Sequence, residues 1–118
     1  MDAARYAALF LSESREHLTE VDDALLALER DHADAATAGA HLATVFRGVH
    51  TIKGMAAAMG YAAVEQLSHA LESRCEPLRS GTEELSGDVL ALLFDGTDLL
   101  RTAVDEVPRS EERRVGKE

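Results

Sequence analysis

The chain has 118 residues, 22 of them acidic and 12 basic, which gives a formal net charge of −10 at pH 7. This length fits one compact domain, and the charge disfavours nucleic acid and anionic membranes as partners, because both repel an acidic surface. The chain contains no run of roughly 20 apolar residues that could span a membrane and no recognisable signal peptide. The single Cys75 cannot form an internal disulfide. These features are typical of a cytoplasmic protein without direct membrane contact.

The abundance of Ala, Leu and Glu and the presence of only two prolines favour helices. The first predicted helix covers about residues 2–30. Its apolar positions recur at spacings of three, four and seven residues, as in a helix packed in a bundle: Leu11, Leu18, Val21, Leu25 and Leu28. Residues 31–34, which include His32, break this pattern.

The second predicted helix runs from about residue 36 to Met59, and Gly60 ends it. Its inward positions are Leu42, Val45, Phe46, Val49, Ile52, Ala56 and Met59. A third helix begins near Tyr61, with inward positions Val64, Leu67, Leu71, Cys75 and Leu78. Pro77 lacks a backbone donor and clashes with the preceding turn, so we expect this helix to kink or stop near Glu76.

A polar loop over residues 79–85 precedes the fourth predicted helix. Ser86 is the expected N-cap, and Asp88 lies in the first turn, where a negative charge is favourable. We expect Pro108 to close the helix, whose inward positions are Val89, Leu92, Leu93, Leu99, Leu100, Ala103 and Val104. Residues 109–118 are charged and aperiodic, which indicates a linker or a frayed tail.

None of these helices can bury its apolar face alone, and the short connections favour antiparallel neighbours. The sequence therefore predicts an all-α fold, an up-down antiparallel four-helix bundle, over residues 1–108.

The second predicted helix carries a group of residues whose side chains are suited to a chemical reaction. His50, Lys53 and Gly54 are three and four residues apart and share one face of a helix. At about 100° per residue, His50 lies roughly 100–120° from the apolar face, so its ring should reach solvent on the flank of the bundle. Gly54 costs about 1 kcal/mol relative to Ala inside a helix, and a larger residue there would partly cover His50. Docking of a partner or close packing of a neighbouring helix would each explain this glycine.

The third predicted helix offers a complementary polar flank, formed by Glu65, His69, Glu72 and Glu76. His50 and Glu72 are nearly equidistant from the turn at Gly60, so antiparallel packing brings them together. A carboxylate that accepts from Nδ1–H fixes the imidazole tautomer and leaves the Nε2 lone pair available for attack. The same carboxylate favours imidazolium, which is not nucleophilic, so its benefit must be orientation.

Three segments resemble the histidine phosphotransfer (HPt) domain, more narrowly the N-terminal phosphotransfer domain of CheA-type chemotaxis histidine kinases. They are residues 50–54 (His-Thr-Ile-Lys-Gly), 59–61 (Met-Gly-Tyr) and 68–72 (Ser-His-Ala-Leu-Glu). The likeness covers about residues 3–107 and includes the opening residues 10–14 (Phe-Leu-Ser-Glu-Ser). A start at residue 1 without an upstream receiver or membrane segment favours the CheA type over the terminal domain of a hybrid sensor.

The resemblance implies roles for particular residues. His50 would be phosphorylated on Nε2 by an ATP-binding kinase domain, Lys53 would neutralise the phosphoryl group, and Glu72 would orient the ring through Nδ1. His69 would join the hydrogen-bonded cluster, and the binding surface would include Gly54, Ala57 and Glu65.

The resemblance also implies partners. The phosphoryl group would pass to an aspartate of a CheY-like response regulator, which supplies Mg²⁺, so ATP and Mg²⁺ belong to partner domains and this domain binds no cofactor or metal. The isolated domain would be a monomer without turnover of its own, and a short fifth helix at the C-terminal end would fit the family.

Three alternatives remain open. A purely structural helical module would keep every function after His50→Gln, and a free-standing phosphorelay protein would differ from a kinase fragment in having no ATP-binding domain encoded downstream. A metal-binding bundle would use two histidines and two glutamates: His50, Glu65, His69 and Glu72. Carboxylate-bridged bundle sites use inward-facing Glu-x-x-His motifs, whereas here Glu65 precedes His69 by four residues and both should face outward.

Overall fold

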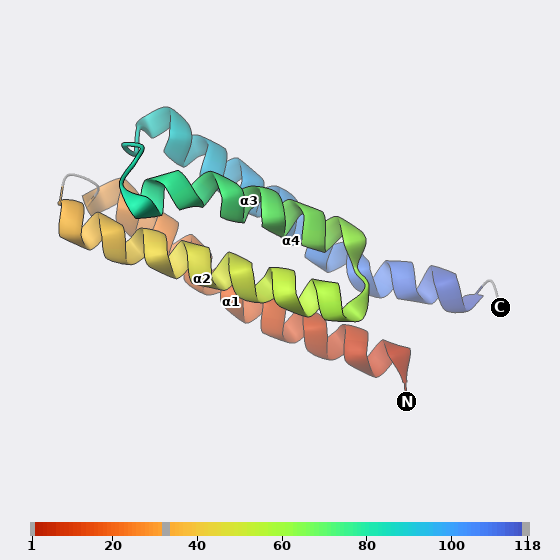
Figure 1. Ribbon diagram of the computed structural model, residues 1–118. Helices are drawn as coiled ribbons and strands as arrows, with labels where there is room; N and C mark the ends of the chain where they lie inside the picture. Colours follow the sequence, from red (N-terminus) through yellow and green to blue (C-terminus); the bar gives the residue numbers. More distant parts are fainter. Residues whose placement is uncertain (1, 32–33, 117–118) are drawn as a thin grey trace.

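The structure, a computed structural model, describes residues 2–31 and 34–116, with side chains up to residue 109. It contains the helices α1 (Ala3–Asp31), α2 (Ala35–Met59), α3 (Ala62–Ser80) and α4 (Gly87–Gly116). Consecutive helices run antiparallel, so the start of α1 and the end of α4 lie at the same end of the molecule (Figure 1). The pairs in contact are α1–α2, α2–α3, α3–α4 and α1–α4, which closes the four helices around one core. The predicted all-α four-helix bundle is confirmed.

The predicted break at His32 lies outside the described residues. Within the described ranges, no helix is both long enough and apolar enough to cross a membrane.

Side-chain caps mark the starts of two helices. The Asp34 carboxylate accepts from the backbone N–H groups of Ala36 and Thr37, at 3.1 and 3.4 Å, at the start of α2. The Ser86 hydroxyl accepts from the backbone N–H of Val89 at 3.2 Å at the start of α4, so the predicted N-cap is confirmed. Each cap satisfies backbone donors that have no partner inside the helix.

Glycines in the left-handed region end α2 and α3. Gly60 has φ 75° and Gly81 has φ 83°, and the N–H of each bonds back to the last turn of its helix. Only glycine adopts this conformation without steric cost, which explains why the chain reverses at these two points.

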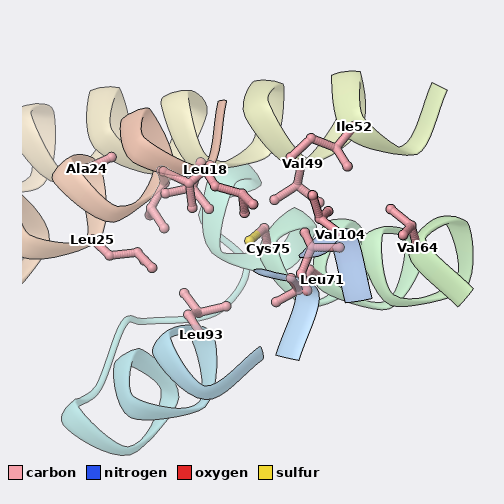
Figure 2. Close-up of a cluster of buried hydrophobic side chains, with 14 of the residues drawn as sticks. Leu18, Ala24, Leu25, Val49, Ile52, Val64, Leu71, Cys75, Leu93 and Val104 are labelled. Atoms are coloured by element: carbon pink, nitrogen blue, oxygen red, sulfur yellow. The ribbon is translucent and has the colours of Figure 1, made fainter. Parts of the chain in front are cut away.

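The core runs along the bundle and takes one apolar face from each helix (Figure 2). Its fully buried large apolar side chains are Leu18, Val21, Leu25, Leu28, Val45, Val49, Ile52, Val64, Leu93, Leu100 and Val104. The predicted inward faces of the first three helices are confirmed by this set and by the partly buried residues packed against it. Since full burial of one such side chain contributes about 1.5–3 kcal/mol, tertiary packing rather than helix propensity holds the helices together.

The predicted inward face of the fourth helix is partly wrong. Leu92 and Leu99 are 51% and 59% exposed, while Leu90 and Val107 are buried. Leu92 and Leu99 each precede a core leucine by one residue, which turns them about 100° away from the core direction. Adjacent leucines left the register of this face ambiguous in the sequence.

Two glycines allow neighbouring helices to approach more closely than a side chain would permit. A Cβ atom at Gly48 would lie 2.7 Å from Cγ2 of Val21, and one at Gly96 would lie 2.6 Å from Cδ2 of Leu71. Both separations are shorter than real Cβ atoms show. Gly48 therefore permits the packing of α2 on α1, and Gly96 that of α4 on α3.

A kink or a stop of α3 is expected near Glu76 from the sequence. The helix passes through Pro77 and ends at Ser80, so the stop does not occur there and the kink stays a prediction. Proline has a helical φ and removes only one backbone hydrogen bond at this point. Leu78, the next residue, is buried in the core, and the Pro77 carbonyl accepts from the N–H groups of Thr82 and Glu83, at 2.9 and 3.1 Å. These contacts fix the last turn of the helix and the start of the loop that follows.

Helix α4 likewise passes through Pro108 and reaches Gly116, so the expectation that Pro108 closes it is wrong. Val104 and Val107 are buried just before the proline, which anchors the helix in the core up to that point. Residues 109–116 extend α4, and no separate fifth helix occurs in the described part of the chain. The domain boundary at residue 108 and a linker role for residues 109–118 stay predictions.

Candidate functional site

His50 lies near the middle of α2, and its side chain is 61% exposed. Its neighbour Val49 is fully buried. One residue of helix rotates the side chain by about 100°, so His50 stands on the flank of the bundle between core and solvent. The predicted exposure of the ring is confirmed.

One carboxylate, that of Glu72, pairs with both His50 and Lys53. Nδ1 of His50 pairs with Oε2 of Glu72 on α3, and Nζ of Lys53 donates to Oε1 of the same residue at 2.6 Å. An ionised carboxylate only accepts hydrogen bonds, so Nδ1 carries the proton in this contact. In a neutral ring the lone pair is then on Nε2, to which no described group is hydrogen-bonded. The predicted pairing of His50 with Glu72 is present.

The environment of Glu72 keeps it charged. Burial, which leaves the side chain 14% exposed, raises the pKa of the Glu72 carboxyl group. The hydrogen bonds from Lys53 and His50 and their positive charges together outweigh burial, so the pKa lies below its ordinary value of 4.5. Because Lys53 shares the carboxylate, the imidazole does not face an uncompensated negative charge.

The surface beyond His50 is open. A Cβ atom at Gly54 would meet no atom within 4 Å apart from the helix's own neighbouring backbone, which excludes close packing of another helix as the reason for this glycine. Ala57, one turn further along α2, is exposed as well. His50 is therefore flanked by small residues on the side toward the C-terminal end of α2.

An aromatic contact at His50 was not foreseen from the sequence. The Phe46 ring lies parallel to the His50 ring, with an interplanar angle of 7° and 6.1 Å between ring centroids, and Cζ of Arg79 lies 4.4 Å from the Phe46 ring centroid. The four-residue spacing of Phe46 and His50 is a signal that could have revealed their contact. The approach of Arg79 depends on the register of α3 against α2, which the sequence does not carry.

The remaining predicted site residues stand apart from this cluster. His69 is exposed and Glu65 is half-buried, and neither makes a side-chain hydrogen bond to His50, Lys53 or Glu72 in the described part of the chain. Their predicted roles therefore stay predictions. Over the same residues, no group of three or more His, Cys, Asp or Glu side chains is arranged to hold a metal ion.

The comparisons with known proteins agree with this geometry. Residues 5–110 match the Hpt domain family, so the chain belongs to the Hpt domains, the class of helical domains in which a histidine carries a phosphoryl group. Within that class it is similar to chemotaxis protein CheA of Bacillus subtilis, with 38% identity over 107 residues, which are 91% of this chain. The chain spans about 15% of the length of the curated relatives it matches.

Two solved structures resemble the bundle closely. The CheA phosphotransferase domain from Thermotoga maritima has a TM-score of 0.79 and 31% identity, over 91% of this chain and 98% of that domain. The phosphorylated P1 domain of CheA3 from R. sphaeroides, solved in complex with CheY6, has a TM-score of 0.81 and 30% identity. The match covers 92% of this chain and 81% of that chain. The resemblance to CheA-type phosphotransfer domains is thus confirmed.

Proposed function

We propose that His50 is the phosphoacceptor of a chemotaxis phosphotransfer domain. It takes a phosphoryl group from an ATP-bound kinase domain of the same protein and gives it to an aspartate of a CheY-like response regulator. The observation that carries the proposal is the exposed ring whose Nδ1 is held by Glu72 and whose Nε2 is left available. The R. sphaeroides relative in complex with CheY6 supports a response regulator as the second partner.

The transfer is a pair of displacements at phosphorus. The Nε2 lone pair attacks the γ-phosphorus of ATP, the bond to the β-phosphate oxygen breaks, and ADP leaves with that electron pair. A carboxylate oxygen of the regulator then attacks the same phosphorus, and the N–P electron pair returns to Nε2. Such reactions depend mainly on positioning and charge compensation.

The site has groups for both tasks. The ring becomes positively charged as the N–P bond forms, and the Glu72 carboxylate is already in place to stabilise that charge. Lys53 holds the other oxygen of Glu72 and places an ammonium group one turn from His50. ATP and Mg²⁺ are supplied by the partner domains, and this domain binds neither as a resident cofactor. We place the domain in the cytoplasm as a monomer without turnover of its own.

Labelling with radioactive ATP and the cognate kinase domain tests the proposal. The chain should acquire an acid-labile, base-stable label, which is absent in His50→Gln and present in His17→Gln, His32→Gln and His41→Gln. Glu72→Ala should slow labelling while the helical circular dichroism is kept. A label that survives His50→Gln overturns the assignment.

Two further measurements separate the alternatives. Stoichiometric metal retained after mild dialysis, detected by elemental analysis, would favour a metal-binding bundle over a phosphocarrier. An ATP-binding domain in the same reading frame would identify a kinase fragment, and its absence a free-standing phosphorelay protein.

A further inference from the structure

The contact between Phe46 and His50 is one between parallel rings on successive turns of α2. Their centroids are 6.1 Å apart and their planes differ by 7°, which is an offset-stacked arrangement within the range that aromatic pairs favour. Phe46 is half-buried and packs against the core. The exposed imidazole thus rests beside a ring that the bundle itself holds in place.

The Phe46 ring is in turn covered by a cation from α3. Cζ of Arg79 lies 4.4 Å from the ring centroid, within the range of a cation–π interaction. The guanidinium is held by Glu76, with Nη2 at 2.8 and 3.0 Å from the two carboxylate oxygens. Glu76, Arg79, Phe46 and His50 form a continuous series of contacts from α3 to the site, which we call the Phe46 stack.

We propose that the Phe46 stack positions His50 by fixing the plane of its imidazole ring, an inference that rests on the phosphoacceptor role proposed above. The hydrogen bond from Nδ1 to Glu72 holds one edge of the ring. A single hydrogen bond leaves rocking about the donor–acceptor axis unrestrained. The face contact with Phe46 opposes that motion, because rocking would break the parallel arrangement.

Fixing the plane matters because the Nε2 lone pair lies in it. Attack on phosphorus requires this lone pair to point along the line of the breaking bond, and a misplacement of about 1 Å can cost on the order of a hundredfold in rate. Glu72 sets the direction of the ring within its plane, and Phe46 sets the plane itself. Together they leave one orientation of Nε2 for both the accepting and the donating step.

The test compares Phe46→Leu, which keeps apolar bulk but removes the ring, with Phe46→Tyr, which keeps the ring. We expect Phe46→Leu to lower the kcat for labelling by the kinase domain about three- to tenfold with little change in KM, as the loss of one aromatic contact implies. Phe46→Tyr should restore kcat. The same variants, labelled with ¹⁵N at histidine, should show by NMR a displaced and broadened His50 ring signal in Phe46→Leu only.

Variants of Arg79 provide a second test of the proposal, with Arg74 as the matched control. Arg74 lies on the same helix and makes a similar two-bond ion pair with Glu83, at 2.6 and 2.8 Å, but no aromatic ring under Arg74 is present among the described residues. We expect Arg79→Gln to lower kcat about twofold, Arg79→Lys to restore it, and Arg74→Gln to leave it unchanged.

Each result decides the proposal. An unchanged kcat together with an unchanged His50 signal in Phe46→Leu overturns it. A change in KM alone also overturns it, because that result identifies Phe46 as a docking contact for the kinase domain. Equal losses in Phe46→Leu and Phe46→Tyr also overturn it. If the wild-type chain is not labelled at all, the proposed function fails, and the NMR comparison still decides whether Phe46 orients the ring.

Discussion

Gly48 and Gly54 lie on the same helix, and their surroundings differ. Gly48 is buried, and a Cβ atom there would press into Val21 of α1, whereas a Cβ atom at Gly54 would point into open space beside His50. The close approach of α2 to α1 depends on Gly48, whereas no contact between the described helices depends on Gly54. Gly48 therefore serves helix packing, whereas for Gly54 we predict a role in access to His50.

The largest effect within α2 should come from placing the same alanine at both positions. Gly48→Ala and Gly54→Ala gain the same helix propensity of about 1 kcal/mol, but only Gly48→Ala overpacks the seam between α1 and α2, at about 1–3 kcal/mol. Their free energies of unfolding, measured by urea denaturation, should therefore differ by about 2 kcal/mol, with Gly54→Ala the more stable. Equal stabilities would show that Val21 yields without cost.

The next effect is on transfer rather than on stability. Gly54→Leu should slow phosphoryl transfer about tenfold, since a side chain there leans back over His50, while the melting temperature stays the same or rises. Gly39→Leu is the matched control, because Gly39 lies on the same helix with open space around it and is distant from His50. Equal transfer rates in the two leucine variants would contradict an access role for Gly54.

A smaller effect concerns the acid that holds His50 in place. Because the pKa of Glu72 is lower in the folded state, its charge stabilises the fold above the ordinary value of 4.5, and this contribution is lost as the pH falls through the lowered pKa. The difference in unfolding free energy between wild type and Glu72→Gln should therefore shrink as the pH falls from about 4.5 through the lowered pKa of Glu72. A difference that stays constant as the pH falls would contradict a lowered pKa for Glu72.

A last prediction extends the comparison to leucines of α4, where the two exposed leucines should show the smallest effect of all. Leu92→Gln and Leu99→Gln should each change stability by less than about 0.5 kcal/mol, because both side chains are mostly exposed. Leu93→Ala and Leu100→Ala should each cost about 2–5 kcal/mol, because both are fully buried. Thermal unfolding of the four variants checks this, and a large loss in Leu99→Gln would show that its exposed face is covered in solution.

Helical periodicity was sufficient to predict the bundle and the position of the site. It distinguished the core residue Val49 from the exposed His50, and the nearly equal distances of His50 and Glu72 from the turn at Gly60 predicted that Glu72 lies across from the ring. Both predictions use only the geometry of single helices and one antiparallel hairpin.

Features that depend on packing between helices could not be predicted in this way. The missing N–H and the steric clash of Pro77 predict the end of a helix, but α3 continues to Ser80 and buries Leu78, the residue after the proline. The contact of Arg79 with Phe46 and the sharing of Glu72 by Lys53 require the exact height of α3 against α2. The sequence alone did not determine the axial position of α3 against α2 more closely than about one helical turn.

The pairing of Nδ1 with Glu72 leaves His50 a single ring nitrogen for exchange with other proteins. On the proposed function, donor and recipient must use that nitrogen in turn, so they cannot occupy the domain together. Phosphoryl transfer through the domain would then follow ping-pong kinetics, in which the kinase domain must dissociate before the regulator can bind. An excess of unphosphorylated recipient would act as a competitive inhibitor of loading.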